Sequence, residues 1–167
     1  MKATELLALL TEFYRDRLAL RNRHVAAAAH IADYNVNNTY QYVINREETH
    51  LRWLIDALSE FGAPLPAPAR ELPAPSVGKT KKIETAVYRG VLEEDARELG
   101  SFVERWTPRV AAMTHARHRI MLNVVLGESM EHKRLFEQGA AGFEDLLGKR
   151  TGGVARQGGV LPTRWLE

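Results

Sequence analysis

The sequence predicts an all-α fold: a four-helix bundle with one long connection between its second and third helices. Apolar residues recur every third or fourth position along four long stretches, which is the period of a helix with one buried face. No stretch alternates for long with the two-residue period of a strand. The 167 residues are enough for one domain with a substantial core.

The first two helices are predicted over residues 4–31 and 38–61. Neither proline nor glycine occurs in residues 3–33, and the Asn-rich stretch 34–38 predicts a tight reversal into the second helix. Gly62 and the prolines that follow it end that helix. The seam expected to face the core in the first helix consists of Leu6, Leu9, Phe13, Asp16, Leu20, His24, Ala27 and Ile31.

The third and fourth helices are predicted over residues 80–106 and 114–138, after an extended, proline-rich connection. Thr107 and Pro108 indicate the boundary between them, because proline disfavours helix in the residue before it. The alternative is a turn further along, with Thr114 as the N-cap of the fourth helix. The seam of the fourth helix consists of Met121, Val124, Glu128, Glu131 and Leu135.

The C-terminal region is predicted to divide at the end of the bundle. We expect a short helix over residues 143–147, which completes a bundle domain spanning residues 1–147. Residues 148–167 form a tail rich in glycine and arginine. The apolar ending of this tail indicates that it docks on this subunit or on a neighbour.

The composition excludes several classes of protein. The chain contains no cysteine, which excludes disulfides, zinc ribbons, iron–sulfur clusters and thiol catalysis. Its net charge of +2 comes from interspersed acidic and basic residues, so nucleic acid is not an expected partner. Without a phosphate-binding loop, a signal peptide or a bilayer-spanning apolar run, we expect a cytoplasmic protein that binds neither nucleotide nor membrane.

A carboxylate and an imidazole interrupt the apolar seam of the second helix. Glu47 and His50 lie three residues apart, between Val43 and Leu54, so both point from the same helix face. Burying an unpaired carboxylate is costly, and such a site normally has a cation, a hydrogen-bond network or a metal as its partner. The alternative is that one of the two lies at the edge of the seam and reaches water.

Two segments resemble the ferritin-like superfamily, which includes rubrerythrins and bacterioferritins. They are residues 45–54, Asn-Arg-Glu-Glu-Thr-His-Leu-Arg-Trp-Leu, and residues 126–132, Leu-Gly-Glu-Ser-Met-Glu-His. The resemblance covers roughly residues 3–140 and implies a ferritin-like bundle with a crossover between its second and third helices. It also implies two iron or manganese ions, with neither haem nor nucleotide, held by carboxylates and histidines inside the bundle.

The resemblance assigns the metal ligands helix by helix. The second helix supplies Glu47 and His50, and the third supplies Asp95, with Glu98 one turn further along. In the fourth helix the Glu-x-x-His motif of the family is not intact. The residues assigned there are Glu128 with either Glu131 or His132.

The first helix is expected to supply one carboxylate ligand. Asp16 is preferred to Glu12 and His24, because the family pattern requires a carboxylate at this place. The competing interpretation pairs Asp16 with an arginine. The arginines considered for this pairing are Arg17, Arg21 and Arg52.

We expect Glu47, His50 and Glu128 to converge inside the bundle. Without a metal, an arginine or His132 is expected to take the place of the cation. At least one of the two carboxylates is then expected to have a raised pKa, because neighbouring like charges oppose joint ionisation.

The function that the resemblance implies is a di-metal oxidase or peroxidase-like activity, or iron handling. We expect a homo-oligomer, with a dimer as the first hypothesis. Two alternatives stay open: a non-catalytic bundle with a degenerate metal site that acts as an oligomerising or binding protein, and a ferritin-like hydroxylase of an unknown substrate. The fold alone does not choose between them.

Overall fold

The computed structural model describes residues 2–68, 85–143 and 146–147. These residues contain no strand and form the helices α1 (Ala3–Ala28), α2 (Tyr34–Ser59), α3 (Thr85–Ala111) and α4 (Ala116–Ala140). The predicted all-α bundle of four helices is confirmed. None of the helices in this part of the chain has the apolar length needed to cross a membrane.

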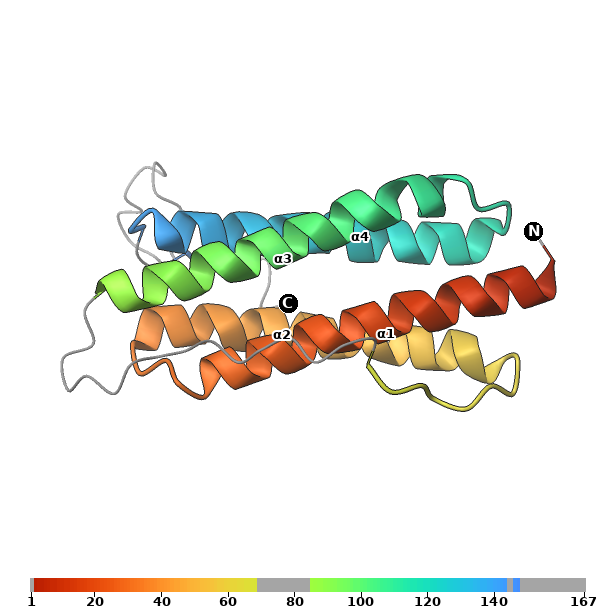
Figure 1. Cartoon of the computed structure of the whole chain (residues 1–167), viewed down its shortest axis with the longest axis horizontal. Helices are drawn as coiled ribbons and strands as arrows, with labels where there is room; N and C mark the ends of the chain where they lie inside the picture. The colour runs from red at the N-terminus through yellow and green to blue at the C-terminus, as the bar shows by residue number, and fades with distance from the viewer. Residues whose placement is uncertain (1, 69–84, 144–145, 148–167) are drawn as a thin grey trace, which may run out of the picture.

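Two helical hairpins make up the bundle (Figure 1). The most extensive helix contacts join α3 to α4 and α1 to α2, and the hairpins meet through α1 against α3 and α2 against α4. α2 and α3 run in the same direction, so α3 begins at the end of the bundle opposite to the end of α2 (Figure 1). The ferritin-like crossover stays a prediction, because residues 69–84 lie outside the described residues.

The reversal between α1 and α2 lies before the Asn-rich stretch, so our prediction of its position was wrong. Asp33 is the N-cap of α2, and its carboxylate accepts a hydrogen bond of 2.9 Å from a backbone N–H of the first turn. Asn37 lies inside α2 and donates from its amide to the carbonyls of Ala28 and Ile31, both at 2.9 Å. This asparagine therefore satisfies carbonyl groups at the end of α1, and the turn itself falls on residues 29–33.

α3 continues through Pro108, where we predicted a boundary. The helix runs to Ala111, because Trp106 and Val110, two residues to either side of the exposed Pro108, are buried in the core and hold the chain in place. The reversal falls on residues 112–115, close to the alternative position. The N-cap of α4 is His115, which makes no side-chain cap hydrogen bond, and not Thr114.

A glycine with positive φ follows the end of α2 and the end of α4. Gly62 lies just after α2 with φ +62° and Gly142 just after α4 with φ +87°, a left-handed conformation that glycine adopts without strain. The short helix expected over residues 143–147 falls partly outside the described residues. The tail 148–167 lies outside them entirely.

The buried face of α4 is displaced by one residue from the predicted seam. Val124 is 43% exposed and Glu131 is exposed, whereas Glu128 lies at the margin of the core. The residues of α4 that enter the core are His118, Leu122, Val125, Leu126, Ser129, His132 and Phe136.

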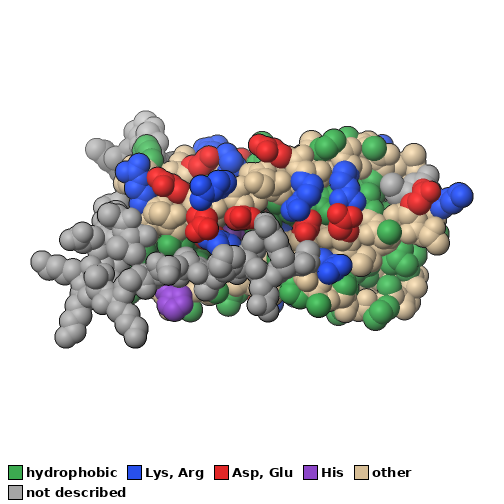
Figure 2. Space-filling model, viewed as in Figure 1, with side chains coloured by type: hydrophobic (Ala, Val, Ile, Leu, Met, Phe, Trp, Pro, Cys, Tyr) green, Lys and Arg blue, Asp and Glu red, His purple; other side chains and the backbone are tan. Residues whose placement is uncertain are grey.

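Aromatic layers lie on both sides of the polar centre. In one layer Phe13 packs edge-on against Phe102 and Trp106, with ring centroids 5.1 and 4.7 Å apart. In the other, Tyr40 packs against Phe136 with a centroid distance of 4.8 Å. On the face shown in Figure 2, acidic and basic side chains are intermingled rather than gathered by sign.

Candidate functional site

A fully buried arginine lies at the centre of the bundle. Arg17 of α1 places Nη2 3.4 Å from Oε1 of Glu47 and 3.1 Å from Nδ1 of His50, both on α2. Its Nη1 donates to the hydroxyl of Ser129 on α4 at 3.1 Å. The guanidinium also lies 5.6 Å from the centroid of the Phe102 ring. Arg17 therefore supplies the positive charge that burial of the Glu47 carboxylate requires.

His24 of α1 is the second partner of Glu47. Its Nδ1 lies 2.9 Å from both carboxylate oxygens, and both side chains are fully buried. Burial alone would raise the pKa of Glu47, but His24 and Arg17 outweigh it and hold that pKa below its ordinary value.

The two partners of His50 fix the position of its proton. Arginine only donates hydrogen bonds, so Nδ1 of His50 accepts from Arg17 and Nε2 carries the proton. Nε2 then donates to Oε2 of Glu128 at 2.8 Å. Burial and the charge of Arg17 lower the pKa of His50 to about 4, so this imidazole is neutral at pH 7.

Glu128 of α4 connects the buried network to the surface. Its side chain is 29% exposed, and Arg46 of α2 donates to it from Nε at 2.9 Å and from Nη2 at 2.5 Å. The hydrogen bonds from Arg46 lower the pKa of Glu128, and His50 adds to this effect. Our expectation that Glu47 or Glu128 has a raised pKa was therefore wrong, because each carboxylate faces an arginine and a histidine.

His132 of α4 contacts the network through its ring. It is 1% exposed, its ring stacks on His50 with centroids 6.3 Å apart, and Tyr42 meets it edge-on at 6.1 Å. Its Nδ1 has no hydrogen-bond partner among the described residues. Burial and Arg17 lower the pKa of His132 to about 3, so it is a neutral imidazole with unused hydrogen-bonding capacity.

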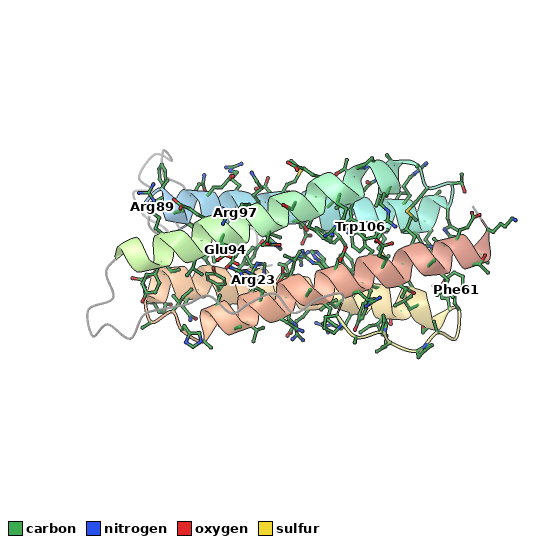
Figure 3. All side chains as sticks on the ribbon, viewed as in Figure 1. Arg23, Phe61, Arg89, Glu94, Arg97 and Trp106 are labelled. Atoms are coloured by element: carbon green, nitrogen blue, oxygen red, sulfur yellow. The ribbon has the colours of Figure 1, made fainter. Side chains whose placement is uncertain are left out.

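A second buried ion pair holds Asp95 of α3. Arg23 of α1 and the hydroxyl of Tyr40 both donate to its carboxylate, and Arg23 also pairs with Glu94 at 3.0 Å. Figure 3 shows Arg23 and Glu94 next to one another between α1 and α3. Burial and Asp95 raise the pKa of Tyr40, so the phenol keeps the proton that it donates. Asp95, the expected ligand of the third helix, is thus bound by an arginine.

The remaining predicted ligands are Asp16, Glu131 and Glu98. Asp16 accepts from the indole of Trp106 at 2.9 Å and pairs with Arg105 of α3 at 3.3 Å, so its arginine partner is not one of those we considered. Glu131 is exposed on α4, and Glu98 is half-buried on α3.

Sequence reasoning missed Arg46 and Ser129, and it considered Arg17 only as a partner of Asp16. For Arg17 a signal was present, because strictly alternating steps of three and four residues in α1 pass through it rather than through Asp16. That series consists of Leu10, Phe13, Arg17, Leu20, His24, Ala27 and Ile31, all buried.

The residues do not fit two metal ions in this arrangement. The resemblance implies that metal ions neutralise the buried carboxylates. In this structure arginines lie there instead: Arg17 faces Glu47 and His50, and Arg23 faces Asp95. A metal ion bound to the same atoms would lie within a few Å of a permanent positive charge. In the described part of the chain, no three His, Asp or Glu side chains are grouped to hold a metal.

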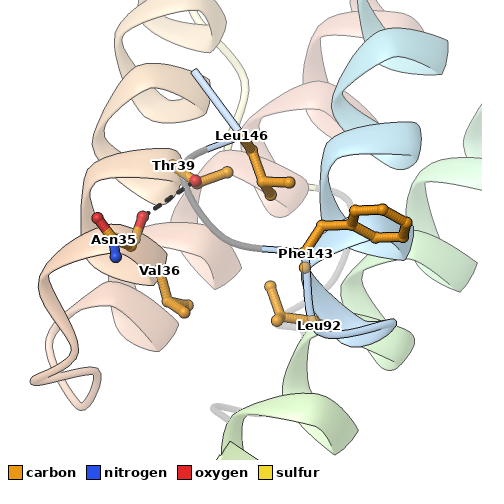
Figure 4. A pocket seen from close by; sticks show the side chains of 7 residues that line it. Asn35, Val36, Thr39, Leu92, Phe143 and Leu146 are labelled. Carbon is orange, nitrogen blue, oxygen red and sulfur yellow. Dashed lines mark hydrogen bonds between the residues drawn. The ribbon is translucent and has the colours of Figure 1, made fainter. Parts of the chain in front are cut away.

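An open groove of about 560 Å³ lies beside the network, between α2 and α4. It is large enough for a small molecule. By contrast, the apolar pocket in Figure 4, which Val36 and Leu92 help to form, has a volume of about 20 Å³ and room for about one water. The groove is lined by Tyr42, Arg46, Glu128, Glu131, His132, Leu135, Leu146 and Leu147.

Comparison with known proteins finds no matching family model, curated protein or solved structure. The resemblance to the ferritin-like superfamily therefore stays a prediction that rests on the two segments quoted above.

Proposed function

We propose that this chain is a non-catalytic binding protein on a ferritin-like bundle, in which buried arginines take the place of the metal ions. The observation that carries the proposal is the position of Arg17, which is fully buried in contact with both Glu47 and His50. A side chain that neutralises the carboxylate from within removes the need for an exchangeable cation. Of the functions considered, this geometry favours the binding protein over the oxidase, the iron-handling protein and the hydroxylase.

The groove between α2 and α4 is the proposed ligand site. Tyr42 and Leu135 offer apolar surface, and His132 offers a neutral imidazole. Glu128 accepts from Nε and Nη2 of Arg46, which leaves Nη1 of this five-donor side chain for a ligand. These groups suit a small amphipathic molecule with an aromatic or aliphatic body and an anionic end.

Elemental analysis tests the role of Arg17. Protein produced with iron or manganese supplied is expected to carry substoichiometric metal. The Arg17→Glu variant is expected to gain metal, because it adds a carboxylate where the cation lay and leaves Glu47 and His50 in place. The matched control is Arg21→Glu, at a partly exposed position of the same helix, which should gain none. Stoichiometric metal in the unsubstituted protein would overturn the proposal in favour of the di-metal function.

Binding of an aromatic sulfonate, 1-anilinonaphthalene-8-sulfonate, tests the groove. We expect saturable fluorescence enhancement that Tyr42→Ala and Arg46→Met weaken severalfold, because one removes the apolar wall and the other the cation. The matched control is Leu18→Ala in the separate groove between α1 and α2, which should bind the probe unchanged. Equal binding by all variants would contradict the assignment of the ligand site.

A further inference from the structure

The outward face of α4 carries an exposed stripe of side chains. Positions three and four residues apart lie on one face of a helix. Seven exposed residues of α4 share one face in this way. Ile120 is 63% exposed, Val124 43% and Met130 58%, so large apolar groups recur along this face. The α4 stripe consists of Ile120, Asn123, Val124, Gly127, Met130, Glu131 and Arg134.

Gly127 lies at the middle of the α4 stripe, and nothing in the described residues requires a glycine there. A Cβ added at this position would meet no heavy atom within 4 Å, and the residue lies inside a regular helix. Glycine destabilises a helix interior relative to alanine, but it allows another backbone to approach closely. The glycine and the exposed apolar groups around it indicate a partner outside this molecule.

We propose that two copies of this chain associate through the α4 stripe, antiparallel, about a two-fold axis at Gly127. Positions equally far from Gly127 then face one another, so Val124 of one copy lies opposite Met130 of its partner, and Ile120 lies opposite Arg134. Val124 and Met130 make an apolar contact on each side of the axis, and Ile120 packs on the aliphatic stem of Arg134.

The charges of α4 favour the antiparallel arrangement. Before Gly127 the helix carries Arg117 and Arg119 and no carboxylate. The exposed carboxylates of the helix, Glu131 and Glu137, both come after Gly127. An antiparallel pair about this axis places Arg117 of one copy at the level of Glu137 of its partner. A parallel pair would oppose the two basic halves.

The size of the stripe indicates a weak dimer. Seven residues of one helix are fewer than the roughly 20–30 residues a side of a stable complex. Association is therefore expected to be reversible and to depend on protein concentration.

Sedimentation at increasing concentration tests the proposal. The mass of the full chain is expected to rise from that of the 18.8 kDa monomer toward twice this value. Gly127→Leu should abolish the rise because the side chain separates the two backbones. The matched control Gly90→Leu, at another exposed helical glycine with no neighbour within 4 Å, should leave the rise unchanged. A monomer at every concentration, or a dimer that persists in Gly127→Leu, would overturn the proposal.

A single introduced cysteine locates the axis directly, because the chain contains none of its own. In Gly127→Cys the two thiols lie at the two-fold axis and should form an intermolecular disulfide on mild oxidation, as cross-linking requires a close Cα approach. Gly90→Cys is the matched control and should stay largely monomeric under the same oxidation. Equal cross-linking of the two variants would place the interface elsewhere and overturn the proposal.

Discussion

At the scale of single residues, Arg17 acts on three ionisable groups at once. It helps to lower the pKa of Glu47, and together with burial it lowers the pKa values of His50 and His132. Because arginine stays protonated in proteins, Arg17 and the three groups it acts on hold a fixed pattern at pH 7: one cation, one carboxylate and two neutral imidazoles. The directions of the hydrogen bonds from Arg17 to His50 and from His50 to Glu128 follow from that pattern.

Replacing Arg17 with methionine is expected to destabilise the protein by about 3–5 kcal/mol, because it leaves a buried carboxylate without its cation. Urea unfolding followed by circular dichroism measures the change. The double variant Arg17→Met/Glu47→Leu is the control and should recover most of the loss, since an apolar pair of similar volume replaces the ion pair. Equal losses in the single and double variants would contradict the role of Arg17 as counterion.

The neutral histidines predict a pH dependence of stability. The pKa values of His50 and His132 are about 4 and about 3 in the folded protein, below the ordinary value near 6.5. Between about pH 4 and pH 6.5 the unfolded chain therefore binds more protons than the folded protein does. The free energy of unfolding should therefore fall as the pH falls below 6.5, by up to about 2 kcal/mol per histidine at pH 5.

The same measurement on His132→Leu checks this assignment. The variant should lose part of the decrease between pH 6.5 and pH 5, because it lacks one of the two groups that take up protons on unfolding. His30→Gln is the control at an exposed position and should keep the full decrease. A stability that does not change over this pH range would contradict the neutral state of the two imidazoles.

At the scale of the elements, the junction of α1 and α2 depends on side chains that act across it. Asn37→Ala removes both hydrogen bonds to the end of α1 and should lower the free energy of unfolding by about 1 kcal/mol per bond. Asn38→Ala, at the exposed neighbouring position, is the control and should change stability little. Chemical denaturation of the two variants makes the comparison. Equal effects would show that the asparagine does not cap α1.

The helices themselves were predictable, because apolar residues recur with the helical period over many turns. The residues at which the helices end, and the face of each helix that is buried, were not. In α4, apolar residues occupy both adjacent stripes, Val124 in one and Val125 in the other, so only the partner helices decide which stripe is buried. At the centre, Glu47 and His50 stood out as polar groups in an apolar seam. Arg17 did not, since arginine is mostly exposed in proteins and its burial depends on groups far apart in the sequence.

At the scale of the whole molecule, the polar core joins one hairpin to the other. Arg17 binds Ser129 and His50 binds Glu128, and four further interactions also connect α1 or α2 to α3 or α4. Hydrogen bonds require defined distances and angles, so this network fixes the relative position of the hairpins more closely than apolar contacts do. The other interactions of this kind are Arg46–Glu128, Arg23–Asp95, Tyr40–Asp95 and Trp106–Asp16.

This arrangement predicts that the two hairpins unfold as one unit. Fluorine NMR of protein labelled with 5-fluorotryptophan reports on each hairpin separately, through Trp53 in α2 and Trp106 in α3. Both signals should have the same urea midpoint in the unsubstituted protein. The triple variant Arg23→Met/Asp95→Leu/Glu128→Ala removes connections between the hairpins and is expected to separate the two midpoints.

Glu12→Ala is the control for this experiment. It removes the pair of hydrogen bonds, each 2.6 Å, that Arg109 of α3 donates to Glu12 of α1 at the surface of the same interface. Exposed ion pairs contribute little to stability, so the two midpoints should stay together in this variant. Separate midpoints in the unsubstituted protein would show that the buried network does not couple the hairpins. Coincident midpoints in the triple variant would assign that coupling to the contacts it retains, among them the aromatic layers around Phe13 and Phe136 and the hydrogen bonds of Arg17 to Ser129 and of Trp106 to Asp16.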